Sequence, residues 1–309
     1  MPSSITHAYL AIDIFNNLDK KVKKIVNLED YKTYSQGPDI FYFYHIMFPF
    51  TKKARTIQDL GRTIHHEKTN DLFLSLTKQV KSTKNINQFN YLVGLFTHYM
   101  ADSTIHPYVE YKAELLNKKY LERKDNHFFL ETYFDNYYIS KHNLDYKKFK
   151  GSNFCFNAKK NLDVINLLNK SIENVFDIKN MGIYYYKSLQ EMKLFFKVFR
   201  YDPYKIKRYI YNILNVITKR CFRDIRYLSY NFPLDKTIDY LNLNHVPWHY
   251  LNNKNITSNK SIIDLYDEVV NKTVIKINLL YDYIFNNKEV DLDLLFENLS
   301  YGTGLPLNK

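Results

Sequence analysis

Three side chains with metal-binding chemistry recur at a spacing of four residues in one segment: His98, Asp102 and His106. On an α-helix, positions i, i+4 and i+8 fall within an arc of about 80°, so these side chains point the same way. The rise from His98 to His106 is about 12 Å, whereas a metal lies only about 2.0–2.2 Å from an imidazole nitrogen or a carboxylate oxygen. One ion therefore does not easily bind both histidines. The spacing instead favours a cluster in which the Asp102 carboxylate, between them, bridges two ions.

Further imidazoles and carboxylates lie elsewhere in the first half of the chain. His127 and Glu131 have the same i, i+4 spacing, which places both on one face of another helix. Asp39 follows Gln36-Gly37-Pro38, a turn sequence that can hold its side chain at a cleft. The remaining candidates are His7 near the chain start and the adjacent pair His65 and His66.

Each of these features has a simpler explanation when it is taken alone. A histidine and a carboxylate four residues apart commonly form a helix-stabilising pair. Asp39 is typical of a turn residue, and an isolated His7 is typical of an exposed one. The aromatic run 41–44 indicates core packing more often than lipid contact, and lysine-rich faces indicate solvated surface. The joint occurrence of these ligand types favours a metal site over the separate explanations.

Helices must position these side chains, because the chain has only seven glycines and eight prolines to interrupt them. Apolar residues recur at helical spacing in most long segments, so the predicted fold class is all-α. Pro107 is expected to end the helix that carries His106. Segment 34–50 is expected to be a loop that enters a buried region. Helices are predicted from Ser4 or Thr6 onwards and over residues 69–82, 87–105, 126–141, 160–178, 184–199, 203–229 and 260–287.

A chain of 309 residues suits one large domain or two ordinary ones. Eight of the ten histidines lie at or before His142. This distribution predicts a metal-binding helical core, residues 1–150, and a helical extension packed on it, residues 151–309. The two units are not expected to be independent, and the glycine-containing segment 301–304 can fold back toward either.

The overall composition restricts the class of protein further. Forty-four basic and 32 acidic residues give a net charge of +12, which favours phosphate-bearing partners without choosing between nucleic acid and anionic lipid. Cys155 and Cys221 cannot form a disulfide framework and are expected to be buried, reduced thiols. The chain start has no signal-peptide pattern, and the most apolar stretch, residues 40–50, is too short to span a bilayer. These features predict a cytoplasmic protein.

Taken in order, the motifs of the front half resemble those of the zinc-dependent phospholipase C family. That family is similar to the bacterial phosphatidylcholine-preferring phospholipase C, and its all-helical fold is shared with the single-strand-specific zinc nucleases. The matching pieces are Met1–His7, Gln36-Gly37-Pro38-Asp39, Leu60-Gly61 with His65-His66-Glu67-Lys68-Thr69, His98-x-x-x-Asp102-x-x-x-His106-Pro107 and His127-x-x-x-Glu131. The ordered set is specific, whereas any single piece is weak. Segments 247–249 and 300–305 resemble uncharacterised cytosolic members less closely.

The resemblance implies a cluster of two or three zinc ions with defined ligands. One ion would be held by Asp39, His65, His98 and Asp102, a second by His106, His127 and Glu131, and a third by His7 with Asp102. His65 is preferred because the H-x-E-K-T pattern of the cytosolic members starts there, while the sequence leaves His66 open. Secreted relatives also bind the third ion through an amino-terminal tryptophan. This chain begins Met-Pro, so its third ion is expected to be weak, differently ligated or absent.

The predicted function is hydrolysis of a phosphodiester, foremost at a phospholipid head group, by a zinc-activated hydroxide. Asp39 is the candidate catalytic residue, as a ligand and general base on a loop. The expected partner is a phospholipid or another phosphodiester substrate, with peripheral contact to a membrane. Two alternatives stay open. One is a single-strand nuclease or nucleotidase with nucleic acid at the same zinc cluster, and the other is a non-catalytic interaction protein that zinc stabilises.

Overall fold

A computed structural model describes residues 4–46, 51–119, 126–145, 147–198, 206–207, 209–210, 213 and 237–307. Helices dominate these residues, and the strands among them form one short antiparallel hairpin, which confirms the predicted all-α class. The elements are α1 (Ser4–Asn17), α2 (Lys20–Lys23), α3 (Leu28–Tyr34), the 3-10 helix η1 (Gly37–Phe43), α4 (Lys52–His66), α5 (Thr69–Thr83), α6 (Ile86–Lys119), α7 (Asn126–Lys141), α8 (Gly151–Cys155), α9 (Leu162–Phe176), α10 (Met181–Val198), β1 (Trp248–Tyr250), β2 (Asn253–Ser258), α12 (Ile262–Phe285) and α13 (Leu292–Phe296). None of the helices in this described part combines the length and the apolar character needed to cross a membrane.

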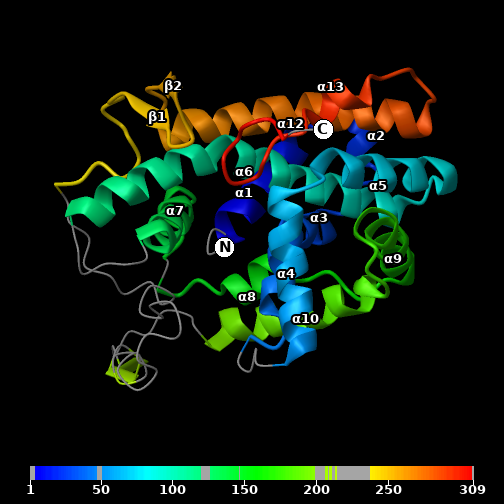
Figure 1. Ribbon diagram of the computed structural model, residues 1–309, viewed down its shortest axis with the longest axis horizontal. Helices are drawn as coiled ribbons and strands as arrows, with labels where there is room; N and C mark the ends of the chain where they lie inside the picture. Colours follow the sequence, from blue (N-terminus) through cyan, green and yellow to red (C-terminus); the bar gives the residue numbers. More distant parts are fainter. Residues whose placement is uncertain are drawn as a thin grey trace.

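The long helix α6 lies at the centre of the molecule. It contacts α1, α3, α7 and α12, and its residues 88–103 are buried without interruption. A helix that is apolar on most of its circumference must be enclosed on all sides. Accordingly, α12 covers one edge of the molecule and α10 the opposite edge, with α6 and α1 between them (Figure 1). Polar side chains on α6 therefore lie inside the protein rather than at its surface.

Pro107 does not end α6, contrary to the sequence-based expectation, because the helix continues to Lys119. Proline cannot donate a hydrogen bond to the carbonyl four residues earlier, which belongs to Ser103. Packing compensates for this loss. Beyond the proline, four residues are buried against α7 and the segment around Trp248 in a second apolar cluster, namely Tyr108, Val109, Ala113 and Leu116. Tertiary burial thus maintains the helix where local sequence predicts its end.

Other expectations were confirmed or corrected more simply. The helices α5, α7, α9, α10 and α12 begin and end within three residues of their predicted positions. No helix was predicted over α4 or strand over the hairpin, and the segment predicted as a loop contains the buried 3-10 helix η1. The predicted helix over 203–229 lies mostly outside the described residues, as does Cys221, whereas Cys155 is a buried free thiol as predicted.

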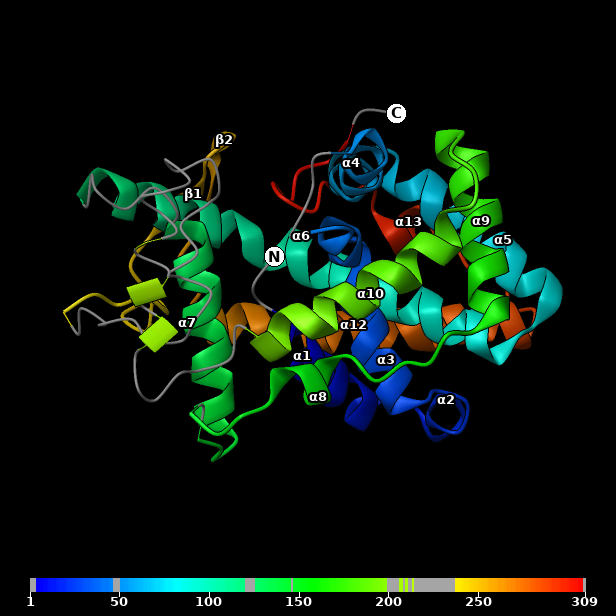
Figure 2. The same cartoon turned by 90° about the horizontal axis from the view of Figure 1, so that it is seen from below.

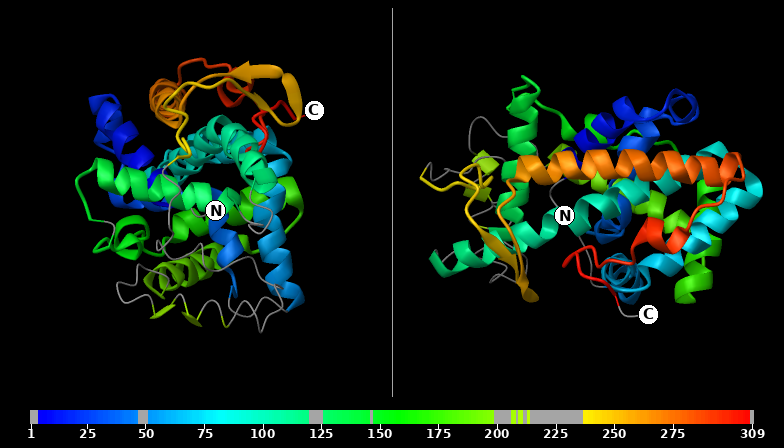
Figure 3. Two further views of the ribbon diagram at one scale, coloured as in Figure 1. Left: turned by 90° about the vertical axis from the view of Figure 1, so that its left-hand side faces the viewer. Right: turned by 90° about the horizontal axis from the view of Figure 1, so that it is seen from above.

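Residues on both sides of position 150 share the main hydrophobic core. The ring of Tyr138 on α7 stacks on that of Tyr266 on α12 with centroids 4.4 Å apart, and the hydroxyls of Tyr34 and Tyr186 are hydrogen-bonded at 3.0 Å. Figure 2 shows the face that carries α10, and the right-hand view of Figure 3 shows α12 crossing the opposite face. The C-terminal segment, residues 299–307, returns to α6, where a Cβ at Gly304 would lie 2.4 Å from the Ser103 carbonyl oxygen.

Candidate metal centre

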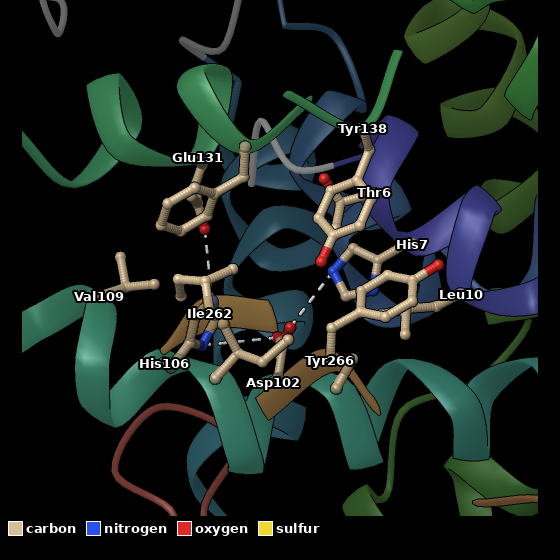
Figure 4. A pocket seen from close by; sticks show the side chains of 13 residues that line it. Thr6, His7, Leu10, Asp102, His106, Val109, Glu131, Tyr138, Ile262 and Tyr266 are labelled. Atoms are coloured by element: carbon tan, nitrogen blue, oxygen red, sulfur yellow. Dashed lines mark hydrogen bonds and ion pairs between the residues drawn. The ribbon is translucent and has the colours of Figure 1, made fainter. Parts of the chain in front are cut away.

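The row of side chains predicted on α6 lies on one helix face. His98 Nε2 is 3.1 Å and His106 Nδ1 is 3.7 Å from Asp102 Oδ2, so the carboxylate lies between the two imidazoles. Figure 4 shows Asp102 flanked by His106 and by His7 from α1. His98 and Asp102 are buried, whereas His106 is partly exposed.

A first group joins His98 to residues of η1 and α4. His65 Nε2 lies 3.2 Å from Asp39 Oδ1 and 3.4 Å from His98 Nε2, and all three residues are buried. Gly37 makes this approach of η1 to α6 feasible. Its φ is +55°, and a Cβ there would lie 2.4 Å from the His98 ring. The Gly-Pro-Asp turn therefore presents the Asp39 carboxylate beside two imidazoles.

A second group joins the far end of the α6 row to α7. The carboxylate oxygen Oε1 of Glu131 lies 3.3 Å from His106 Nε2 and 3.1 Å from His127 Nε2. The Glu131 side chain is 2% exposed, while those of His106 and His127 are 15% and 26% exposed. This group is thus the more accessible of the two.

His7 reaches the centre from α1, where its Nε2 lies 3.3 Å from Asp102 Oδ1. The start of α1 is held by Asp135 on α7, whose carboxylate accepts hydrogen bonds from the backbone N–H of Thr6 at 2.8 Å and from its hydroxyl at 2.7 Å. These bonds satisfy donors that a helix N-terminus otherwise leaves free. Burial raises the pKa of Asp135 to about 8, although these hydrogen bonds act in the opposite direction. The amino-terminal helix is therefore fixed relative to α7, which carries Glu131.

The hydrogen bonds of the imidazoles define which ring nitrogen faces the centre. Backbone carbonyls lie 2.6–3.2 Å from three Nδ1 atoms, in the pairs His65 with Gly61, His98 with Ser35, and His106 with Tyr301. A carbonyl oxygen only accepts, so each Nδ1 carries a proton, and in the neutral ring Nε2 carries a lone pair. These Nε2 lone pairs face carboxylate oxygens, which are also hydrogen-bond acceptors without a proton to donate. Protonating every ring would place like charges together, since the His7 and His98 rings stack at 4.5 Å.

A metal cation between these facing acceptor atoms would bind their lone pairs. Zinc bonds of about 2.0–2.2 Å in a tetrahedron place neighbouring ligand atoms about 3.3–3.6 Å apart. The closest Nε2 and carboxylate pairs at the centre are separated by 3.1–3.3 Å. Among the described residues, three groups bring such atoms together: His7, His98 and Asp102; Asp39, His65 and His98; and His106, His127 and Glu131. The donor set therefore fits zinc ions. The group of His106, His127 and Glu131 is the one predicted, whereas Asp102 falls with His7 and His98 rather than with Asp39 and His65.

The carboxylates at the centre are held in their charged form. Burial alone raises the pKa of Asp39, but nearby positive charge, including that of His65 and His98 when they are protonated, lowers it to about 2. The pKa values of Asp102 and Glu131 lie well below their ordinary range for the same reasons, because burial is outweighed by adjacent imidazoles. For His7, burial and the neighbouring His98 lower the pKa. A buried anionic centre with histidine partners suits a divalent cation.

The structure distinguishes the adjacent histidines of α4. His65 is buried with Nε2 directed at Asp39, whereas His66 is exposed. Sequence reasoning missed two other residues. Glu110 lies 2.9 Å from His127 Nδ1, and the Tyr301 carbonyl lies 3.2 Å from His106 Nδ1. Glu110 continues the four-residue spacing of the α6 row, a signal that the expected helix end at Pro107 concealed.

A cavity of about 20 Å³ lies between the His7 and His106 sides of the centre. Asp102 and Glu131 contribute to its polar wall, and apolar side chains of α1, α6, α7 and α12 also line it (Figure 4). A buried water needs about 10–15 Å³ and two to four polar partners. The space thus accommodates about one water molecule next to the carboxylates.

Comparison with known proteins identifies one family. The family described as zinc dependent phospholipase C matches residues 6–181, more than half of the chain, and this range contains every predicted metal ligand. No curated protein and no solved structure matches the chain. Tyr301 lies outside the matched range.

Proposed function

Because the chain belongs to the zinc-dependent phospholipase C family, we propose that it is a zinc-dependent phosphodiester hydrolase that releases the phosphorylated head group of a phospholipid. The observation that carries this proposal is the convergence of imidazole nitrogens and buried carboxylates in groups of three, whose ligand atoms lie within 4.8 Å of one another. Bound zinc would lower the pKa of a coordinated water and neutralise charge that develops on the phosphoryl oxygens.

The chain's own residues would bind and orient the reactants. Asp39, His65, His98 and Asp102 would hold one ion, His106, His127 and Glu131 a second, and His7 with Asp102 a third. The second group has three protein ligands and is the more exposed, which suits an ion that keeps a position open for substrate. Asp39 stays ionised at neutral pH, so its carboxylate can accept a hydrogen bond from a water molecule and orient it. No protein nucleophile is required.

The net charge of +12 supports a phosphate-bearing substrate, and peripheral contact with an anionic membrane is consistent with it. The same charge attracts single-stranded nucleic acid. A nuclease or nucleotidase is therefore the competing assignment, and the assay below separates the two.

The test compares substrates on zinc-loaded protein. Mixed micelles of phosphatidylcholine, phosphatidylethanolamine, phosphatidylglycerol and phosphatidylinositol are incubated with the protein, and released phosphorylated head groups are measured beside digestion of single-stranded DNA. We expect head-group release that a chelator abolishes and that Asp39→Asn lowers by about 100-fold or more. Asp59→Asn is the control, because Asp59 is an exposed α4 residue paired with Arg62. Cleavage of DNA alone, or no release from any lipid, would overturn the proposal.

A further inference from the structure

Among the described residues, Glu110 is the carboxylate within hydrogen-bonding distance of the Nδ1 atom of a predicted zinc ligand. His65, His98 and His106 each direct Nδ1 to a backbone carbonyl. His127 instead directs Nδ1 to the Glu110 carboxylate at 2.9 Å and Nε2 to Glu131 at 3.1 Å. Its imidazole thus lies between two carboxylates, one inside the centre and one at its rim.

We propose that Glu110 is a positioning residue for the second metal group, which orients His127 and strengthens its Nε2 as a ligand. The inference rests on the proposed zinc centre. A carboxylate that accepts the proton of one ring nitrogen fixes the tautomer and raises the basicity of the other nitrogen. Glu110 therefore acts on the ion through His127, without occupying a place among the ligands.

The location of His127 explains why this ring needs such a partner. It is the second residue of α7 and has a side chain that is 26% exposed. The other ring contacts of His127 in the described structure are with the edges or tilted faces of His106 and Phe128, at centroid distances of 5.5 and 5.8 Å. Such contacts do not select between the two ring nitrogens. The charge-assisted hydrogen bond to Glu110 does.

The continuation of α6 places Glu110 at this position. Glu110 follows His106 by four residues, so its carboxylate lies on the same helix face as the α6 row, next to the start of α7. Burial of Tyr108 and Val109 in the second apolar cluster fixes this turn of α6. The Glu110 side chain is 48% exposed, whereas the Glu131 side chain is 2% exposed. The outer carboxylate can therefore be changed without opening the core.

The test measures zinc binding rather than activity. Glu110→Gln and Glu110→Ala are compared with Glu114→Gln, a control one helical turn further on, where the glutamate pairs with Lys118 at the surface. Zinc is titrated against a chromophoric chelator, and bound zinc is counted after dialysis. We expect both Glu110 variants to lower the affinity of one ion by about 10- to 100-fold, Glu110→Asp to recover part of it, and Glu114→Gln to match the parent.

A double-mutant cycle separates positioning from a general structural effect. If Glu110 acts through His127, Glu110→Ala adds no further loss of zinc to His127→Ala. Additive losses, or parental zinc affinity in both Glu110 variants, would overturn the inference, as would a parent protein that binds no zinc. If the affinity effect occurs and yet no phosphodiester is hydrolysed, the inference stands and the proposed function fails.

Discussion

Adjacent histidines at the end of α4 have different surroundings. His65 is buried, with Nδ1 2.6 Å from the Gly61 carbonyl and Nε2 3.2 Å from Asp39. The exposed His66 points in a different direction from His65, because neighbouring residues are rotated by about 100° around the helix axis. The H-x-E-K-T pattern favours His65, and the geometry agrees with that choice. The ligand role itself is a prediction that substitution can test.

We expect His65→Ala to remove about one zinc ion per chain, because one member of a tetrahedral ligand set is lost. His66→Ala should retain the parental zinc content. Elemental analysis of both proteins, purified in parallel without added chelator, measures the difference. Equal loss in both variants, or loss in His66→Ala alone, would contradict the assignment of His65.

At the scale of elements, α6 and the C-terminal segment hold the metal centre together. Tyr301 donates its backbone N–H to the His65 carbonyl at 3.1 Å, and its carbonyl lies 3.2 Å from His106 Nδ1. One residue thus connects α4 with α6. Gly304 permits this close approach, because its φ is +63° and a Cβ there would lie 2.4 Å from the Ser103 carbonyl oxygen.

Gly304→Ala is therefore expected to displace the C-terminal segment and to lower the free energy of unfolding by about 1–3 kcal/mol. The matched control is Gly302→Ala, where the new Cβ meets only the His66 ring at 3.5 Å, an ordinary contact. Chemical denaturation of both variants measures the change. The prediction is wrong if the two substitutions have the same effect.

At the scale of the whole molecule, the metal centre lies where most of the fold meets. Its side chains come from α1, η1, α4, α6 and α7. Buried carboxylates and lone pairs that face one another oppose folding unless a cation compensates them. Metal binding and global stability should therefore be coupled.

Removal of zinc should lower the melting temperature, and reloading should restore it. With free zinc at about 1,000 times its dissociation constant, binding contributes about 4 kcal/mol to stability. Calorimetry of the chelated protein across a series of zinc concentrations measures this contribution, with magnesium as the control ion. A melting temperature that does not depend on zinc concentration would show that the centre does not bind zinc in the native state.

The sequence by itself determined the all-α class, the positions of five long helices and the shared face of His98, Asp102 and His106. These features follow from helical periodicity, which depends only on neighbours a few residues apart. The three-dimensional grouping of Asp39, His65 and His98 agrees with the groups implied by family resemblance.

Only the tertiary structure decided what depends on packing between distant segments. The continuation of α6 through Pro107 depends on burial against α7 and the Trp248 region, so the position of Glu110 beside His127 could not be foreseen. The contact of Tyr301 with His106 joins residues 195 positions apart. No local pattern encodes such contacts, because they form only when the whole core brings the helices together.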